Sequence, residues 1–176
     1  KFNSLLIELA ENSVIKNFKT TENSITQKDG REAEEMILRF FALNNNLDDY
    51  NNKLSKYLDK YMEGMHQSNE DEIASKKELF GKTLNRVLKV FNEEDLFKNL
   101  GRSQQRQSIA IYDLVMYTFS NLTDEFVDQN KVELYNKFKE LFENEEFNKT
   151  LSGGVQQKYS ILKRRDLLKE KIDTLI

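Results

Sequence analysis

The sequence contains no cysteine, no proline and no tryptophan, and its single histidine is His66. Without cysteine the chain can form neither a disulfide framework nor a thiolate metal site. One histidine also excludes a zinc site that needs two or more imidazoles. No stretch approaches the roughly 18 uninterrupted apolar residues of a membrane-spanning helix, so we expect a soluble, cytoplasmic protein with no membrane partner. The composition predicts no metal and no cofactor.

The absence of proline removes the strongest helix breaker from all 176 residues, and only six glycines remain. Between clusters of Asn, Asp, Ser and Gly, the apolar residues recur every three or four positions, which is the period of an α-helix. No alternating pattern bounded by turn residues predicts a sheet. We therefore predict helices over residues 2–18, 31–43, 49–65, 72–91, 104–119, 124–142 and 155–176.

Two of these predicted helices, 31–43 and 104–119, are apolar on most of their faces. Such helices belong inside a bundle, with amphipathic helices packed around them. We predict an all-α fold, a single irregular bundle of about seven helices that forms one domain over residues 1–176. Thr123 is expected to cap a helix, because Asp124 and Glu125 follow it and acidic residues are favoured in a first turn.

The charge balance is slightly acidic. Twenty-seven Lys and Arg against thirty Asp and Glu give a net charge of -3, whereas a dedicated nucleic-acid-binding domain usually has a basic excess. Basic residues nevertheless gather locally, and such stretches can contact phosphate groups. Between Leu96 and Tyr112 the only charged residues are Lys98, Arg102 and Arg106. The candidate nucleic-acid contacts are Arg102, Gln104, Gln105, Arg106, Lys163, Arg164 and Arg165.

Each candidate also has a structural interpretation. Residues 104–106 can form the exposed first turn of the helix predicted over 104–119. Three adjacent residues cannot share one helix face, so at least one of Lys163, Arg164 and Arg165 is expected to pair with a nearby acid. Glu35 and Arg39, four positions apart, predict a structural ion pair. The sequence names no catalytic residue, because no nucleophile, metal cluster or acid–base pair can be identified in it.

Residues 151–157 read LSGGVQQ, which is similar to the signature sequence of ABC-type ATPases. In those proteins glycines and a helix N-terminus contact a nucleotide phosphate. The remainder of a nucleotide site is not recognisable, since Gly81-Lys82-Thr83 ends like a phosphate-binding loop but Lys76 stands where its first glycine is required. We therefore interpret the two glycines of LSGGVQQ as a turn that leads into the last helix.

Several helical motifs follow one another in an order known from a bacterial family. They are Glu35–Leu43 (EMILRFFAL), Asp49-Tyr50, Leu58–Met62 (LDKYM), Ser108–Met116 (SIAIYDLVM) and a closing segment that runs from Phe147 through Thr150 to Val155. This order resembles the GmrSD-type restriction proteins, which carry a ParB/sulfiredoxin-like N-terminal domain. The resemblance spans nearly the whole chain.

The resemblance implies a nucleotide-dependent protein that restricts DNA in phage defence, with its chemistry in the N-terminal domain. The Asp-Gly-Gln-Gln-Arg motif of that domain is not in this sequence. The chain therefore resembles the downstream helical region, and we expect a fragment whose partner is the upstream catalytic domain. Its expected role is a non-catalytic support or regulatory region with weak DNA contacts. The alternative is a helical protein–protein interaction or dimerisation module, such as a homodimer, without a nucleic-acid role.

Overall fold

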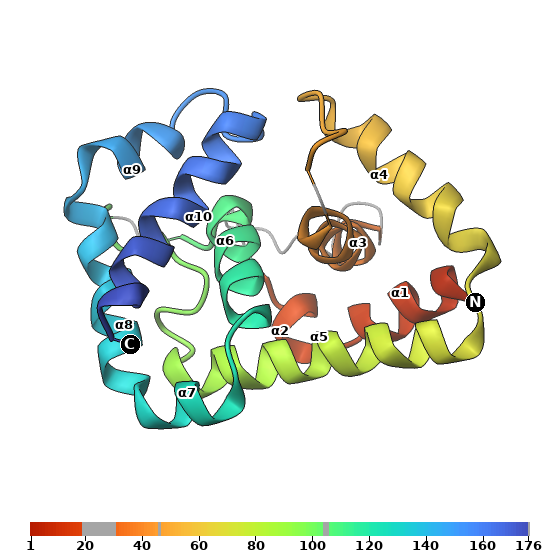
Figure 1. Cartoon of the computed structure of the whole chain (residues 1–176), viewed down its shortest axis with the longest axis horizontal. Coiled ribbons are helices and arrows are strands. Elements are labelled where there is room, and N and C mark those ends of the chain that lie inside the picture. Colours follow the sequence, from red (N-terminus) through yellow and green to blue (C-terminus); the bar gives the residue numbers. More distant parts are fainter. Residues whose placement is uncertain (19–30, 46, 104–105, 176) are drawn as a thin grey trace. The chain divides into compact units, whose positions relative to one another are not determined.

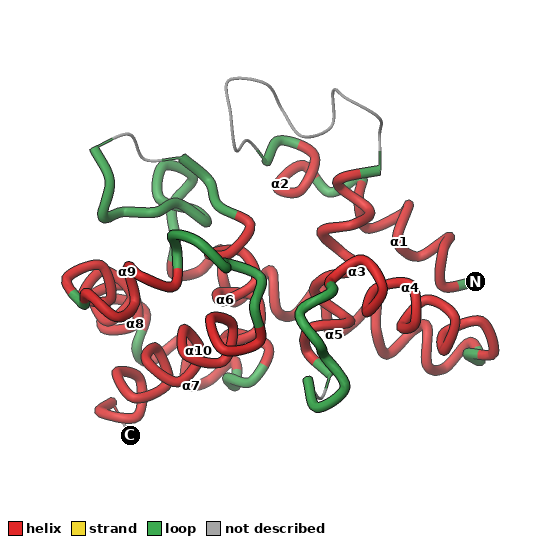
Figure 2. The backbone as a smooth tube through the Cα atoms, turned by 90° about the horizontal axis from the view of Figure 1, so that it is seen from above, coloured by secondary structure: helices red, strands yellow, loops and turns green. Residues whose placement is uncertain are grey.

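The computed structural model describes residues 1–18, 31–45, 47–103 and 106–175. Within these ranges the regular structure is helical, with ten α-helices and three short 3-10 helices (Figure 1). The described residues contain no strand (Figure 2). The described loops between the helices carry one isolated β-bridge, between Lys98 and Gln107. The predicted all-α class is confirmed, although the described helices are more numerous than predicted and most of them are shorter. None of the described helices is long and apolar enough to cross a membrane.

The chain divides into two compact units, Lys1–Gly81 and Lys82–Ile176, which are described separately below. The sequence predicts one domain around two central apolar helices. In the structure these two helices belong to different units, so each unit has one of them in its core.

The first unit contains α1 (Phe2–Ala10), α2 (Ser13–Lys16), α3 (Glu32–Asn44), α4 (Leu54–Gly64), η2 (Met65–Gln67) and the first half of α5 (Glu70–Val90). Helix α3 contacts α1, α2 and α4, and Figure 1 shows it end-on with α1, α4 and α5 around it. Edge-to-face contacts join its aromatic rings to neighbouring helices. The ring centroids of Phe41 and Phe2 are 5.7 Å apart, and those of Phe40 and Phe80 are 5.5 Å apart. Burial of α3 on most faces matches its apolar sequence.

A reciprocal pair of hydrogen bonds starts α5. The Asn69 side chain accepts from the Glu72 amide at 2.8 Å, and the Glu72 carboxylate accepts from the Asn69 amide at 3.1 Å. This capping box satisfies two amides that a helix start otherwise leaves unpaired. It explains why α5 begins at Glu70, two residues before the predicted start.

The second unit contains the second half of α5, then α6 (Ile109–Ser120), α7 (Asp124–Gln129), α8 (Lys131–Glu140), η3 (Leu141–Glu143), α9 (Glu145–Thr150), α10 (Lys158–Ile172) and η4 (Asp173–Leu175). Helix α10 packs against α6, α8 and α9. Helix α6 is buried on most faces, and Tyr112 and Met116 on it are fully enclosed.

Asparagines divide the helices that the sequence predicts as continuous. Asn12 separates α1 from α2 and caps α2 by accepting from the Val14 amide at 3.0 Å. Asn130 separates α7 from α8, and its side chain donates to the Phe126 carbonyl at 2.9 Å. Asn144 caps α9, a short helix within a stretch predicted as a loop. The asparagine side chain bonds to nearby backbone groups and so competes with helix continuation.

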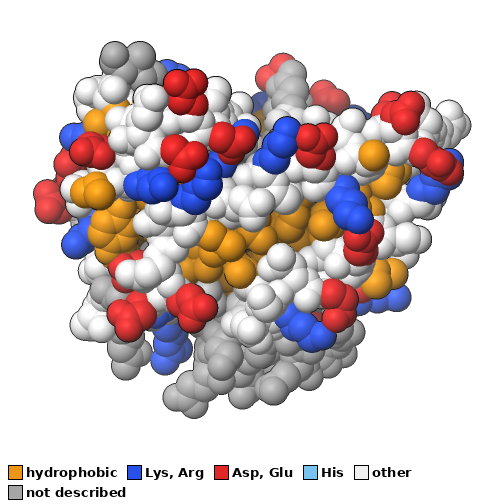
Figure 3. Space-filling model, turned by 90° about the horizontal axis from the view of Figure 1, so that it is seen from below, with side chains coloured by type: hydrophobic (Ala, Val, Ile, Leu, Met, Phe, Trp, Pro, Cys, Tyr) orange, Lys and Arg blue, Asp and Glu red, His pale blue; other side chains and the backbone are white. Residues whose placement is uncertain are grey.

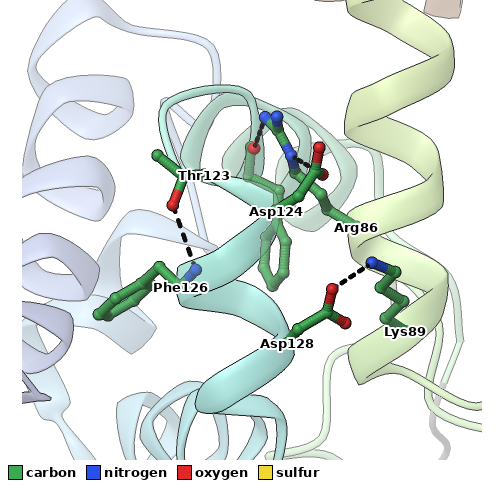
Figure 4. Close-up of polar contacts among 7 residues, drawn as sticks. Arg86, Lys89, Thr123, Asp124, Phe126 and Asp128 are labelled. Atoms are coloured by element: carbon green, nitrogen blue, oxygen red, sulfur yellow. Dashed lines mark hydrogen bonds and ion pairs between the residues drawn. The ribbon is translucent and has the colours of Figure 1, made fainter.

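Polar contacts hold α7 against α5 in the second unit (Figure 4). Arg86 Nε donates to Asp124 Oδ1 at 2.7 Å, and Lys89 Nζ donates to Asp128 Oδ2 at 2.8 Å. The first turn of α7 is closed by Thr123, whose hydroxyl oxygen accepts from the Phe126 amide at 3.1 Å. The predicted Thr123 cap is therefore confirmed.

Candidate functional site

The connection between α5 and α6 in the second unit includes residues 98–103 and 106–107, here called the basic loop, whose two ends pair in a short antiparallel arrangement. Lys98 and Gln107 form the β-bridge at its base. Two further backbone hydrogen bonds close the base, from the Asn99 amide to the Arg106 carbonyl (3.2 Å) and from the Ser108 amide to the Phe97 carbonyl (2.9 Å). The two ends of the loop are thus fixed next to each other.

Buried side chains anchor the loop. Phe97 is 1% exposed, adopts a positive φ of 57°, and packs edge-to-face on Tyr112 of α6 with 5.1 Å between ring centroids. Gly101 lies so close to Phe142 that an added Cβ would be 3.1 Å from the Phe142 Cβ. A larger residue at position 101 would displace this contact, so the glycine allows the loop to pack on Phe142.

The charged residues of the basic loop all have the same sign. Arg102 and Arg106 are exposed, and Lys98 is partly exposed. Among the described residues, neither Lys98 nor Arg102 forms an ion pair. The structure thus brings two of the predicted contacts, Arg102 and Arg106, into one loop with Lys98. The other two predicted there, Gln104 and Gln105, lie outside the described residues.

The helix predicted over 104–119 starts later than expected. Helix α6 begins at Ile109, because Ser108 has an extended backbone (φ −132°, ψ 128°) and its amide bonds to Phe97. Arg106 therefore lies on the basic loop and not in the first turn of a helix, and that alternative interpretation is wrong for Arg106.

The run 163–165 on α10 has a different environment. Lys163 Nζ lies 2.9 Å from Glu146 Oε2 on α9, which confirms that at least one member of the run pairs with an acid. This contact raises the pKa of Lys163 and lowers that of Glu146. The guanidinium carbon of Arg165 lies 3.5 Å from the centroid of the Tyr117 ring on α6, a cation–π contact, and Arg165 is buried.

Arg164 connects α10 to the LSGGVQQ segment. Its side chain is 2% exposed, and its guanidinium donates to the carbonyls of Thr150 (2.7 Å) and Val155 (2.9 Å). The segment between these carbonyls turns through Gly153 and Gly154, both with positive φ (67° and 57°), which favours glycine. The interpretation of these glycines as a turn before the last helix is confirmed. In this arrangement Arg164 and Arg165 are engaged inside the unit and do not reach its surface.

The predicted structural pair on α3 joins an exposed position to a buried one. Glu35 is exposed, and Arg39 is 4% exposed. A pair between them remains a prediction.

The arrangement of basic side chains offers electrostatic contact with an anion. In the described part of the chain, no group of three His, Asp or Glu side chains is placed to hold a metal ion. Figure 3 shows Lys and Arg side chains interspersed with Asp and Glu over the face that it displays. The basic loop differs from such mixed surfaces because its sequence contains no acid.

The sequence does not single out two features of the structure, the contacts that fix the basic loop and the pocket position of Lys76. The contacts that fix the basic loop, made by Phe97 and Gly101, depend on a positive φ and on packing against a distant residue, so no local pattern predicts them. Lys76 of α5 lines a pocket in the first unit. A signal for it does exist, because Lys76 falls on the apolar stripe of α5 between Ile73 and Phe80.

Comparison of the chain with protein-family models, with curated proteins and with solved structures gave no significant match.

Proposed function

We propose that this chain is the helical, non-catalytic region of a GmrSD-type DNA restriction or phage-defence protein, and that it contacts DNA phosphates through the basic loop. The restriction role rests on the resemblance of the helical motifs. The DNA contact rests on one observation: the basic loop presents Lys98, Arg102 and Arg106 without an acid between them, on a fixed base. The run 163–165 is left out of this contact, because its members are paired or buried.

The proposed contact is weak and strongly salt-dependent. Each phosphate neutralised by a Lys or Arg contributes roughly −0.9 to the slope of the logarithm of the binding constant against the logarithm of salt concentration. Three basic residues therefore give a slope of about −2 to −3. A slope of this size suits a supporting contact beside a catalytic domain that carries most of the affinity.

The test is the fluorescence anisotropy of a labelled duplex of about 20 base pairs, titrated with the protein between about 25 and about 200 mM salt. The double variant Lys98→Gln with Arg102→Gln is expected to bind several-fold more weakly at low salt and to lose about 2 from the slope. The control variant Lys53→Gln with Lys56→Gln removes the same charge from exposed positions on the first unit. It is expected to bind like the unmodified protein.

Two results would contradict the proposal. One is an anisotropy that does not change at the lowest salt concentration. The other is an equal loss of binding in both double variants, which would show that net charge and not the basic loop determines the affinity.

One observation favours the second candidate function, a protein–protein interaction or dimerisation module. Tyr159 and Leu162 of α10 are 70% and 38% exposed and lie about one helical turn apart, so they form a small apolar surface. Light scattering tests it: a dimer that becomes a monomer with Tyr159→Glu, together with no DNA binding, would favour this function over the first.

A further inference from the structure

A pocket of about 670 Å³ lies in the first unit, between the end of α4 with η2 and the first turns of α5. A smaller pocket of about 350 Å³ lies beside it, and Gly64 and Met65 line both. The larger volume falls within the range of about 300–1,000 Å³ that is typical of small-molecule sites. Its lining combines apolar side chains, among them Leu79, with polar groups.

One basic side chain lines the larger pocket, that of Lys76. Its ammonium donates a hydrogen bond to the Tyr61 hydroxyl at 2.8 Å and lies 5.4 Å from the ring centroids of both Phe41 and Tyr61. Tyr61 in turn lines the smaller pocket, so the Lys76–Tyr61 pair lies where the two pockets adjoin. Among the described residues, no carboxylate forms an ion pair with Lys76.

The surroundings of Lys76 leave its positive charge only partly compensated. The side chain is half-buried, and this burial lowers its pKa, an effect that the charge of Glu72 partly offsets. The Glu72 carboxylate itself accepts from the Asn69 amide in the capping box. The aromatic faces and one hydroxyl replace only part of the water that a free ammonium would bind. An anion in the pocket would supply a further hydrogen-bond acceptor and an opposite charge.

We propose that this pocket binds a small organic acid, with its carboxylate on the Lys76 ammonium and its apolar part against Met65 and Leu79. Asp71 and Glu72 also line the pocket, and their negative charges repel any anion. This repulsion grows with the charge of the ligand, so it acts less on a single carboxylate held by Lys76 than on inorganic phosphate or a nucleotide. The expected ligand class is therefore a monocarboxylate with an apolar body. This site lies in the first unit and is independent of the basic loop in the second.

Benzoate is a suitable probe, since it joins one carboxylate to an apolar ring. In a titration followed by backbone amide NMR, benzoate is expected to shift the amides of Gly64, Met65 and Ser75 in a saturable way. Benzyl alcohol, which has the same ring without the charge, and inorganic phosphate are both expected to bind at least about tenfold more weakly, a factor that corresponds to about 1.4 kcal/mol. Equal binding of benzoate and benzyl alcohol, or no shift of these amides, would overturn the proposal.

Two variants assign the carboxylate contact. Lys76→Met keeps most of the length of the side chain and removes its charge, and it is expected to weaken benzoate binding at least about tenfold. Lys77→Met is the matched control, because Lys77 is the exposed neighbour that pairs with Glu8, and it is expected to bind benzoate normally. Benzoate that binds Lys76→Met as it binds the unmodified protein would overturn the proposal.

A measurement on the unmodified protein keeps the test valid if Lys76→Met does not fold. The side-chain NMR signals of Lys76 report its pKa directly, and a bound carboxylate is expected to raise this pKa. An unchanged Lys76 pKa at saturating benzoate would contradict the assigned contact.

The C-terminal carboxylate of a peptide has the same chemistry as that of a small organic acid, so the peptide N-acetyl-Ala-Phe with a free C-terminus is compared with benzoate. Weaker binding of the peptide is expected. Tighter binding of the peptide than of benzoate would overturn the assignment to a small organic acid.

Discussion

Arg86 and Asp124 form an ion pair in which the guanidinium Nε lies 2.7 Å from the carboxylate Oδ1. The Arg86 side chain is 11% exposed, whereas that of Asp124 is 56% exposed. The same guanidinium donates from Nη1 to the Phe119 carbonyl at 3.2 Å. One side chain of α5 therefore contacts both the last turn of α6 and the first turn of α7, and it links these two helices.

Replacing Arg86 with methionine is expected to destabilise the protein. The variant loses the ion pair and leaves the Phe119 carbonyl without its Arg86 donor, at a cost of about 1–3 kcal/mol in the free energy of unfolding. Lys89→Met is the control, because Lys89 and Asp128 are both substantially exposed and such pairs contribute little. Urea unfolding measures both. Equal losses of unfolding free energy in the two variants would show that the burial of Arg86 does not increase its contribution to stability.

Acid is expected to weaken the second unit. Hydrogen bonds from basic side chains lower the pKa values of four carboxyl groups, Asp124, Asp128, Glu140 and Glu146. A lowered pKa in the folded state means that the folded protein binds fewer protons than the unfolded one, so these pairs stabilise the fold above the ordinary values of 3.8 for Asp and 4.5 for Glu. Their contribution is lost as the pH falls through the lowered pKa values.

Urea unfolding as a function of pH tests this expectation. The midpoint is expected to fall as the pH is lowered below the ordinary carboxyl values, and less so in about 1 M salt, which screens exposed charges. A midpoint that rises on acidification over this interval would contradict the assigned pairs.

Tyr61 and Tyr135 are expected to ionise late. Burial raises the pKa of Tyr61 to about 12, and the hydrogen bond to Asp95 raises that of Tyr135 to about 12. Both groups thus favour the fold below the ordinary value of 10.0, and this contribution is lost as the pH rises toward 12. Phenolate absorbance follows the titration, and Asp95→Asn is expected to shift the Tyr135 step to lower pH. A Tyr135 step that does not move in Asp95→Asn would refute that cause.

Arg164 is expected to be required for stability. Arg164→Met leaves the carbonyls of Thr150 and Val155 without their donor, which costs about 2–4 kcal/mol in the free energy of unfolding. Lys163→Met is the neighbouring control, and its exposed partner Glu146 predicts a much smaller loss. Thermal unfolding compares the two variants. A folded Arg164→Met with unchanged stability that has lost DNA binding would instead support the predicted phosphate contact at Arg164.

The sequence predicts the helices well and the tertiary roles of charged residues less well. Apolar periodicity identifies α3 and α6 as buried helices, and the residues after Thr123 identify a cap, because both features depend on neighbours within a few positions. Apolar periodicity does not predict that the helices are interrupted at Asn12 and Asn130, since asparagine can also lie on the surface of a continuous helix.

The candidate site is predicted only in part. The stretch from Leu96 to Tyr112, which contains basic residues and no acid, identifies Arg102 and Arg106 correctly as exposed groups. The run 163–165 does not reveal that Arg164 and Arg165 are buried. Their burial depends on the carbonyls of the LSGGVQQ segment and on the Tyr117 ring, which the fold brings to α10. A local sequence pattern cannot predict contacts with residues that are distant in the sequence.

The most direct test of the proposed function is a map of the DNA contact by backbone amide NMR with an unlabelled duplex at low salt. If the basic loop binds DNA phosphates, the largest shifts occur at Lys98, Arg102 and Arg106, and the amides of 163–165 change little. Shifts concentrated at 163–165, or the absence of any shift with DNA at low salt, would contradict the proposed contact.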